Sequence, residues 1–322
     1  MSQDILDILK KKYKTNVYAS TEVPTTELVS TGIATLDIAL GGGLAKGRIA
    51  EIYGPESVGK STMCLTMAKA AVNRGESVLY EDLEKTVTNE AIVKHGLDTE
   101  SFLVTRPRHG EEAIDQAIDF IKAGGGLVIL DTVAMLMPKS VYDKIDGDSE
   151  ARDVSSTAGF LNRVKNKLTD QVEFAQAIFV FVNQVRDSMG PHGGLSTPGG
   201  HAIKHAYSQR IRVTHAVKDT NNAGRIRSQV KIEKNKVGTP SLTCEVPIVN
   251  GVVQTLECLL IAATDLNVVT RRGNWHYIPA TDNREEITLG NGASKSAQML
   301  EENTEYRQMI ESALAEKLTN RE

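Results

Sequence analysis

Residues 51–62 read EIYGPESVGKST, in which a glycine, four further residues and the triplet Gly-Lys-Ser follow a short apolar run. This GxxxxGK[ST] spacing predicts a phosphate-binding loop, because the backbone N–H groups of such a loop wrap a phosphate chain at a helix N-terminus. The Lys60 ammonium would lie beside the β- and γ-phosphates, and the Ser61 hydroxyl would ligate Mg²⁺. A chance glycine-rich turn is the alternative, and the apolar run before the loop and the helical pattern after it argue against that. The expected nucleotide contacts span the loop, namely Gly54, Pro55, Glu56, Ser57, Val58, Gly59, Lys60, Ser61 and Thr62.

Acidic residues downstream of the loop could complete a hydrolytic site. Asp131 ends the apolar run LVILD, at the sheet edge where ligands bind, and would hold the metal together with Ser61. An N-cap or turn aspartate is the alternative at such a junction. Hydrolysis also needs a group that orients water, and Glu84 in YEDLEK lies just beyond another strand. Glu81 and Asp82 are rivals that spacing does not separate from Glu84, and a solvated surface acid is the alternative for each.

The elements that would position these residues alternate between apolar runs and helical stretches from about residue 47 to residue 184. This alternation predicts a mostly parallel sheet with crossover helices. Helical spacing is clearest at Ile114, Ala117, Ile118 and Ile121. The expected strands are 47–54, 77–82, 101–107, 126–132 and 177–184. Later apolar runs lack intervening helices and predict an antiparallel extension of the sheet, at 210–217, 228–237 and 242–249. Beyond about residue 256 we expect a helix at 256–266, one strand at 274–279 and a last helix near 302–318.

Length and composition limit the classes of protein. A chain of 322 residues is long enough for one large domain with short terminal pieces. Because the chain starts without an apolar signal-peptide core, and no window approaches the ~20 apolar residues of a membrane span, we expect a soluble, cytoplasmic protein with no membrane partner. Three widely separated cysteines argue against a disulfide framework or a metal cluster. The net charge of −4 does not indicate a nucleic-acid partner, so any such partner would have to bind a local surface.

Several motifs agree in order and approximate spacing with the bacterial RecA recombinases, and the chain resembles this family. They are STGIATLDIALGGGLAKGRIAEIYGPESVGKST, VILDTVAMLMPK, GDS, FVFVNQVR, GG and KNK, followed more faintly by GNWHYI. The resemblance is strongest from about residue 28 to residue 250. It implies an α/β fold with three parts: a short N-terminal helical polymerisation segment at 1–27, a RecA-like P-loop NTPase core with a mostly parallel central sheet at 28–255, and a small C-terminal α/β domain at 256–322.

The resemblance also implies an activity. Members of this family are DNA-dependent ATPases that use ATP and Mg²⁺, polymerise as homo-oligomeric helical filaments on single-stranded DNA, pair it with homologous double-stranded DNA and exchange strands. The N-terminal segment, with Ile5, Leu6 and Leu9 on one helical face, would then dock on the adjacent protomer, and an ordinary surface helix is the alternative. A ring-forming RecA-like DNA motor and an ATP-switched filament scaffold remain alternative functions. The first would carry a linker domain and an arginine finger, which are not evident, and the second would lack a catalytic glutamate, although Glu84 is present.

Site roles follow from the resemblance residue by residue. The catalytic glutamate of the family falls on Glu84 and its Walker B aspartate on Asp131, while Gln184 matches the residue that senses the γ-phosphate and signals to the following loop. Lys234 and Lys236 match two lysines that reach across the protomer interface to the neighbour's ATP. A strand-end glutamine facing water and a solvated edge strand are the alternatives. The expected catalytic set is Lys60, Glu84, Gln184, Lys234 and Lys236.

Two glycine-bearing polar loops, at 143–152 and 185–200, are expected to hold the DNA. They are too poor in periodic apolar residues to form helices or strands, and long loops in compact domains are usually functional or disordered. Candidate phosphate contacts, of which the family places the last two at DNA-backbone positions, are Arg152, Arg163 and Arg186. A mobile surface charge is the alternative for any single arginine. A wedge between bases and two sites of close backbone approach would come from Met189, Gly199 and Gly200.

The chain departs from the family pattern at a few positions. Ala91 stands where the family usually stacks a tyrosine on adenine, and Thr88 replaces a nearby aspartate, so the nucleotide selectivity is left open. Ala151 replaces a larger apolar residue in the first loop, and His205 replaces a common interface phenylalanine. These differences indicate a distant branch of the family and are compatible with a viral source.

Overall fold

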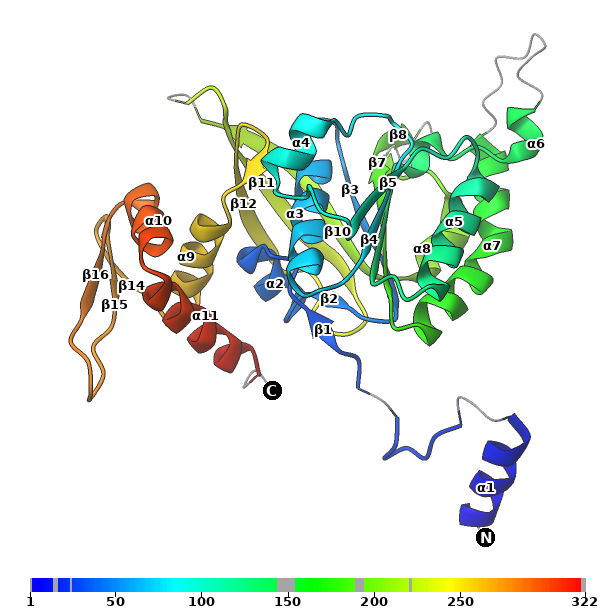
Figure 1. Cartoon of the computed structure of the whole chain (residues 1–322), viewed down its shortest axis with the longest axis horizontal. Coiled ribbons are helices and arrows are strands. Elements are labelled where there is room, and N and C mark those ends of the chain that lie inside the picture. The colour runs from blue at the N-terminus through cyan, green and yellow to red at the C-terminus, as the bar shows by residue number, and fades with distance from the viewer. Residues whose placement is uncertain are drawn as a thin grey trace.

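The computed structural model describes residues 2–13, 17–23, 25–143, 154–188, 194–219 and 222–319. Nine strands form the central sheet (Figure 1): β3 (Arg48–Gly54), β4 (Val78–Asp82), β5 (Phe102–Thr105), β6 (Leu127–Asp131), β7 (Ile178–Gln184), β10 (Tyr207–Lys218), β11 (Arg225–Asn235), β12 (Thr243–Val249) and β13 (Val252–Val253). Their order across the sheet is β13-β12-β11-β10-β3-β7-β6-β4-β5. Pairing is parallel from β10 to β5 and antiparallel from β10 to β13. The predicted α/β fold, with a mostly parallel sheet and an antiparallel extension, is confirmed.

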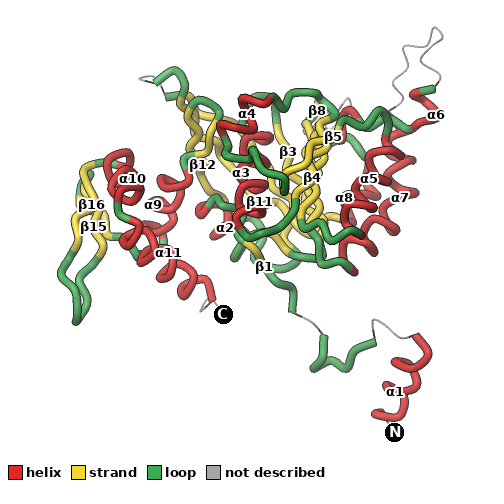
Figure 2. Tube along the Cα trace, in the orientation of Figure 1, coloured by secondary structure: helices red, strands yellow, loops and turns green. Residues whose placement is uncertain are grey.

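Helices cover both faces of the sheet (Figure 2). One face packs against α2 (Ala34–Leu40) and α3 (Lys60–Asn73), and the other against α5 (Gly110–Lys122), α7 (Val154–Phe174) and α8 (Gly200–Ala206). Successive side chains of a strand alternate between the two faces: Val180 of β7 belongs to the apolar core beside α3, whereas Phe179 and Phe181 belong to the one beside α5 and α7. Burying each such side chain stabilises the fold by about 1.5–3 kcal/mol, so the alternation fixes which side chains reach each face. The predicted helical set is fully buried in α5, at Ile114, Ala117, Ile118 and Ile121.

The larger domain also contains several short elements: β1 (Leu28–Val29), β2 (Leu44–Ala45), α4 (Asn89–Lys94), the 3-10 helix η1 (Val133–Met135), α6 (Lys139–Tyr142), β8 (Arg186–Ser188) and β9 (Gly194–Ser196). β8 and β9 pair antiparallel inside the predicted second polar loop. The expectation that residues 185–200 form no regular element was therefore wrong, because backbone hydrogen bonds hold a hairpin without an apolar face. In the first loop, residues 144–152 lie outside the described part of the chain.

The C-terminal part folds around a separate apolar cluster. Its elements are α9 (Thr255–Asp265), β14 (Thr270–Arg272), β15 (Trp275–Ile278), β16 (Ile287–Asn291), α10 (Ala293–Glu302) and α11 (Thr304–Thr319). The sequence predicted the first helix, one strand and the last helix, but β14, β16 and α10 were missed. β14 buries none of its three side chains and β16 buries one of its five, which is too little apolar periodicity to be recognised. The cluster includes Leu260, Ile278, Leu289, Leu300 and Ile310, which fits a small second domain, although the division at residues 255 and 256 stays a prediction.

Helix α1 (Ser2–Tyr13) lies apart from the rest of the chain (Figure 1). Ile5 and Leu9 on its predicted apolar face are 55% and 37% exposed. An apolar stripe open to solvent is what docking on another protomer would use, and that docking stays a prediction. Within the described ranges, each helix is too short or too polar to cross a lipid bilayer.

Glu81 on β4 is a buried carboxyl group on the α5 side of the sheet. Its two carboxyl oxygens are buried and have no hydrogen-bond partner among the described residues. Burial therefore raises the pKa of Glu81 well above its ordinary value of 4.5. The folded state holds a proton that the unfolded state releases.

We expect this group to make the protein less stable as pH rises. Above pH 4.5 the unfolded chain ionises Glu81 while the folded chain does not, so the free energy of unfolding falls by up to about 1.4 kcal/mol per pH unit until the folded carboxyl also titrates. Urea unfolding of wild type and Glu81→Gln between about pH 5 and pH 8 measures this, with the difference between their slopes as the readout. Equal slopes would show that Glu81 does not hold the proton.

Candidate active site

The loop between β3 and α3 has a backbone that glycine makes possible. A Cβ atom on Gly54 would lie 2.0 Å from the Val213 carbonyl oxygen, and one on Gly59 would lie 2.4 Å from the Ile248 Cδ1 atom. Gly59 also has a φ of +92°, in the left-handed region. The described side chains provide no cap for the N-terminus of the 14-residue helix α3. The first N–H groups of α3 are therefore left to bind an anion.

A cavity of about 590 Å³ opens at this helix end, at the carboxyl edge of the parallel strands. Its walls come from four segments that are far apart in the sequence and that the sheet topology brings together: Glu56, Ser57, Gly59, Lys60, Ser61, Thr62, Glu84, Thr86, Asp131, Thr132, Met135, Val182 and Gln184. Most of the predicted nucleotide contacts are in this set. Gly54, Pro55 and Val58 belong to the same loop but lie outside the set that lines the cavity. The Val58 carbonyl instead accepts a hydrogen bond of 2.7 Å from Ser228 Oγ.

Lys60 is held against its own loop. Its Nζ donates to the Gly54 carbonyl at 3.0 Å and also to the Pro55 carbonyl. Burial lowers the pKa of Lys60, whereas the nearby Asp131 and Glu84 carboxylates oppose that shift. The position of this cation at the helix end complements an entering phosphate chain.

Asp131 ends β6 and receives two hydroxyl donors. Its Oδ2 atom accepts hydrogen bonds from Ser61 Oγ at 2.7 Å and from Tyr80 Oη at 2.6 Å. Burial raises the pKa of Asp131, and the two hydroxyl donors and Lys60 counteract the shift. A hydroxyl and a carboxylate oxygen side by side are ligands that suit Mg²⁺, so Ser61 and Asp131 fit the predicted metal site.

Tyr80 is a contributor that the sequence analysis missed. It lies on β4 beside β6, on the same face as Asp131, and it is fully buried. The available signal was positional: once β4 and β6 are neighbours, a tyrosine two residues before Asp82 lies beside the end of β6. Because the Tyr80 hydroxyl occupies one lone pair of the Asp131 carboxylate, it fixes the orientation of that group.

Tyr80→Phe is expected to raise the Mg²⁺ concentration needed for nucleotide binding by about tenfold, because removing a buried outer partner of a metal-binding carboxylate weakens the metal site. Calorimetric binding of a non-hydrolysable ATP analogue across a Mg²⁺ titration measures this. The aromatic ring, 6.2 Å from Phe102, is retained in the variant, and urea unfolding of the metal-free protein reports any general loss of stability. An unchanged Mg²⁺ requirement would contradict the positioning role.

Glu84 and Gln184 meet across the cavity. Gln184 Nε2 donates to Glu84 Oε1 at 2.9 Å. Burial raises the pKa of Glu84, and the Asp131 charge raises it further. The rivals lie elsewhere: Glu81 is buried on the other face, and the Asp82 carboxylate accepts the backbone N–H groups of the loop that follows Glu84. Of the three acids, Glu84 alone is among the residues that line the cavity.

Lys234 and Lys236 lie outside the set of described residues that line the cavity of their own protomer. Lys234 Nζ donates to the Lys204 carbonyl at 2.9 Å, and Lys236 Nζ donates to the His205 carbonyl at 3.2 Å. Both carbonyls belong to the last turn of α8. The two lysine side chains point the same way, as expected for residues two apart, and both reach the C-terminal end of α8.

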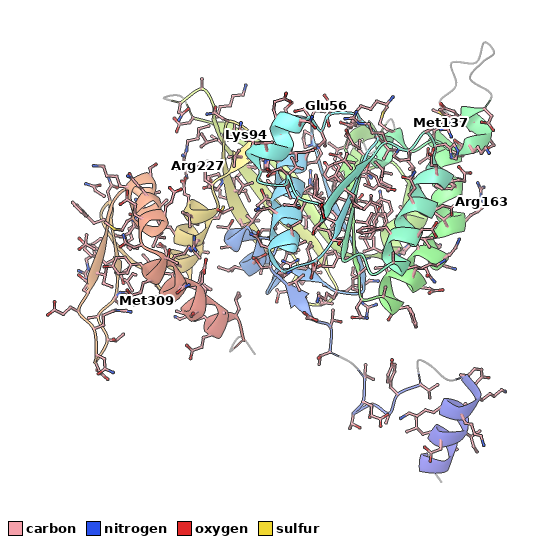
Figure 3. All side chains as sticks on the ribbon, viewed as in Figure 1. Glu56, Lys94, Met137, Arg163, Arg227 and Met309 are labelled. Carbon is pink, nitrogen blue, oxygen red and sulfur yellow. The ribbon has the colours of Figure 1, made fainter. Side chains whose placement is uncertain are left out.

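The predicted DNA-binding residues are described only in part. Arg152 and Met189 lie outside the described residues, and of Arg186 only the backbone, in β8, is described. Arg163 is exposed on the outer side of α7 (Figure 3). Gly199 and Gly200 have φ angles of +99° and +73° at the start of α8, so the backbone conformation already requires them. Their approach to DNA stays a prediction.

Comparison with known proteins places this site in a family. Residues 3–253 match the model of the RecA N-terminal domain. A protein named Protein RecA from Prochlorococcus marinus strain NATL1A is 36% identical over 300 residues, which cover 91% of this chain and 77% of that relative. The protein of the same name from Synechococcus sp. strain WH7803 is 35% identical, with coverage of 91% and 76%. Together with the phosphate-binding loop, Asp131 and Glu84 around one cavity, these matches show that the chain belongs to the RecA family of DNA recombinases, which are DNA-dependent ATPases.

Proposed function

We propose that this chain forms ATP-dependent helical filaments on single-stranded DNA, pairs that strand with homologous double-stranded DNA and exchanges strands, with DNA-stimulated hydrolysis of ATP. The observation that carries the proposal is the meeting of Lys60, Asp131, Glu84 and Gln184 around one cavity at the N-terminus of α3. Each group has the chemistry that phosphoryl transfer requires. A cytoplasmic location is part of the same proposal.

In this proposal the chain's own residues divide the work of hydrolysis. The loop amides and Lys60 hold the phosphate chain, and Ser61 and Asp131 hold Mg²⁺. When bound, Mg²⁺ would neutralise charge on the phosphate oxygens. Glu84 orients the attacking water, and Gln184, which hydrogen-bonds Glu84, exchanges that contact for the γ-phosphate.

The site is completed by a neighbouring protomer. Lys234 and Lys236 lie outside the cavity of their own protomer, so in the filament they supply charge to the next protomer's ATP, as an arginine finger does. A head-to-tail contact of this kind builds an open helix when its rotation does not close. Helix α1, with Ile5 and Leu9 exposed, docks on the adjacent protomer in the same assembly.

DNA binding is assigned to the two polar loops at 143–152 and 185–200. Arg152, Arg163 and Arg186 contact phosphates, so affinity falls with salt and is independent of sequence. Met189 inserts between bases, and backbone amides beside Gly199 and Gly200 approach the strand.

The test is ATP hydrolysis with and without single-stranded DNA, with the same mixtures inspected by negative-stain electron microscopy. The proposal expects DNA-stimulated turnover and extended helical filaments. Closed rings would instead favour a DNA motor. Filaments with turnover that is slow and indifferent to DNA would favour a scaffold in which ATP acts only as a switch.

A further inference from the structure

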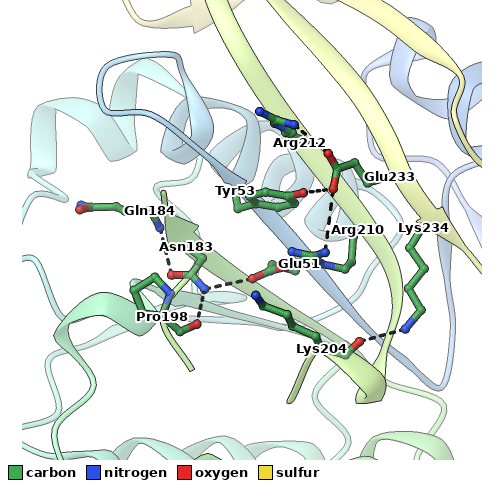
Figure 4. Close-up of polar contacts among 10 residues, drawn as sticks. All are labelled: Glu51, Tyr53, Asn183, Gln184, Pro198, Lys204, Arg210, Arg212, Glu233 and Lys234. Carbon is green, nitrogen blue, oxygen red and sulfur yellow. Dashed lines mark hydrogen bonds and ion pairs between the residues drawn. The ribbon is translucent and has the colours of Figure 1, made fainter. Parts of the chain in front are cut away.

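A chain of buried and half-buried polar contacts crosses four neighbouring strands of the sheet, β7, β3, β10 and β11 (Figure 4). At its centre is Glu51 of β3, whose side chain is fully buried. Glu51 Oε1 accepts a hydrogen bond of 3.0 Å from Asn183 Nδ2 on β7, and Glu51 Oε2 accepts one of 2.6 Å from Arg210 Nε on β10. A buried carboxylate is tolerated because both of its oxygens are paired with donors.

On the β7 side, one amide group holds two functional segments. Asn183 Nδ2 also donates to the Pro198 carbonyl at 3.0 Å, and Asn183 Oδ1 accepts the backbone N–H of Gln184 at 3.0 Å. Pro198 lies at the end of the second predicted DNA loop, just before α8. Asn183 therefore ties the proposed phosphate sensor to the end of that loop.

On the β10 side, the contacts lead toward the proposed protomer interface. The Arg210 guanidinium lies 4.5 Å from the centre of the Tyr53 ring, and its Nη1 atom is 3.9 Å from Glu233 Oε2. Glu233 also accepts hydrogen bonds from Tyr53 Oη and, at 2.9 Å, from Arg212 Nη1. Glu233 precedes Lys234 on β11, so Glu51 lies between the nucleotide-sensing strand and the strand that carries an interface lysine.

We infer that Glu51 is a positioning residue that transmits the nucleotide state from Gln184 to the second DNA loop. The Glu51 carboxylate and the Pro198 carbonyl only accept hydrogen bonds, and the Gln184 N–H only donates one, so together they hold the Asn183 amide with its NH₂ group toward Glu51 and Pro198 and its oxygen toward Gln184. A glutamine at position 51 has one acceptor oxygen in place of two, and its NH₂ group only donates, so it cannot accept from both Asn183 and Arg210 in the present geometry. The Asn183 side chain would then be held less firmly between Gln184 and the loop. This inference rests on the proposed function, because it assumes that Gln184 responds to the γ-phosphate and that the loop binds DNA.

A purely structural role would make Glu51 an ordinary buried ion pair, and the chain offers a matched control for that role. Glu257 of α9 is 3% exposed, and its Oε2 atom accepts a hydrogen bond of 2.6 Å from Arg225 Nη2. It is also a buried carboxylate paired with an arginine of the antiparallel strands, but it lies outside the described residues that line the nucleotide cavity. Glu257→Gln therefore reproduces the loss of a buried carboxylate without touching the path to the loop.

The experiment measures binding of a fluorescently labelled oligo(dT) strand by anisotropy, once with ATPγS and Mg²⁺ and once with ADP and Mg²⁺. The readout is the ratio of the two dissociation constants. We expect Glu51→Gln to reduce the wild-type ratio by about tenfold, the size of a typical coupling between sites, while the affinity for ATPγS changes by less than about threefold. Glu257→Gln should keep the wild-type ratio even where urea unfolding shows that it is less stable.

Asn183→Ala is the second variant, and it leaves the Glu51–Arg210 pair intact, so it does not strand a buried charge. It should collapse the same ratio, and combining it with Glu51→Gln should add little, since both act through one contact. A wild-type ratio in Glu51→Gln, or in Asn183→Ala should the first variant not fold, would overturn the inference. A wild-type protein that binds DNA equally with both nucleotides would instead contradict the proposed function.

Discussion

Glu84→Gln is expected to lower ATP turnover on single-stranded DNA by at least about 100-fold, the usual contribution of a positioned general base. The carboxylate that would orient water is lost, whereas the phosphate cradle made by Lys60 and the loop amides is untouched. The Gln184 amide, which donates to Glu84 Oε1 at 2.9 Å, still finds an acceptor on the new side chain. Steady-state hydrolysis with saturating single-stranded DNA is the measurement.

The control for this variant is assembly. Nucleotide affinity measured by calorimetry, and filaments counted by negative-stain electron microscopy in the presence of ATP, should match wild type. Lys60→Ala provides the contrast, because it removes the cation at the N-terminus of α3 and should weaken nucleotide binding itself. If Glu84→Gln lost filaments and turnover together, Glu84 would be an assembly residue and the water-orienting role would be wrong.

The parts of the site that the sequence predicted are those with local signatures. The GxxxxGK[ST] pattern predicts the backbone conformation of its loop directly, since Gly54 and Gly59 leave no room for a side chain and Lys60 follows in the first turn of the helix. Asp131 was recognised because an apolar strand ends on it. The choice of Glu84 over Glu81 and Asp82 came only from the family resemblance, because spacing alone does not say which of three nearby acids leaves the strand and turns toward the cavity.

What the sequence could not supply depends on contacts between strands. Tyr80 reaches Asp131, and Glu51 reaches Asn183 and Arg210, only because β4 pairs with β6 and β3 lies between β7 and β10. These partners are separated by 51, 132 and 159 residues, so the local sequence pattern cannot predict that they meet. The hairpin of β8 and β9 was missed for a different reason, because a pair of three-residue strands is held by backbone groups that any sequence carries.

Helix α8 is held at both ends by residues with proposed functions. The Pro198 carbonyl, just before the helix, accepts from Asn183, and the carbonyls of its last turn accept from Lys234 and Lys236. Each ammonium has three N–H groups, so a lysine that reached a neighbour's phosphate could also keep its α8 carbonyl and would then connect the neighbour's ATP directly to the end of the helix that follows the second DNA loop.

Replacing both Lys234 and Lys236 by alanine is expected to reduce DNA-stimulated turnover by at least about 100-fold, because charge supplied in trans is worth about 10³–10⁵ in comparable phosphoryl-transfer sites. The phosphate-binding loop of the variant is intact, so the isolated protomer should bind an ATP analogue with wild-type affinity. Hydrolysis assays and calorimetry on the same preparation test both expectations. Loss of nucleotide affinity in the isolated protomer would mean that the lysines act within their own chain.

Mixing the two inactive variants separates action in trans from action in cis. At an interface where the Lys234→Ala/Lys236→Ala protomer supplies the site and the Glu84→Gln protomer supplies the lysines, every required group is present. Random co-assembly of equal amounts produces this arrangement at about one interface in four, so turnover should recover to about a quarter of wild type, far above either variant alone. Pull-down of one tagged variant with the other verifies co-assembly. Mixed filaments that remain inactive would show that Glu84 and the lysines must belong to one chain, because no head-to-tail arrangement of separate chains would then complete the site.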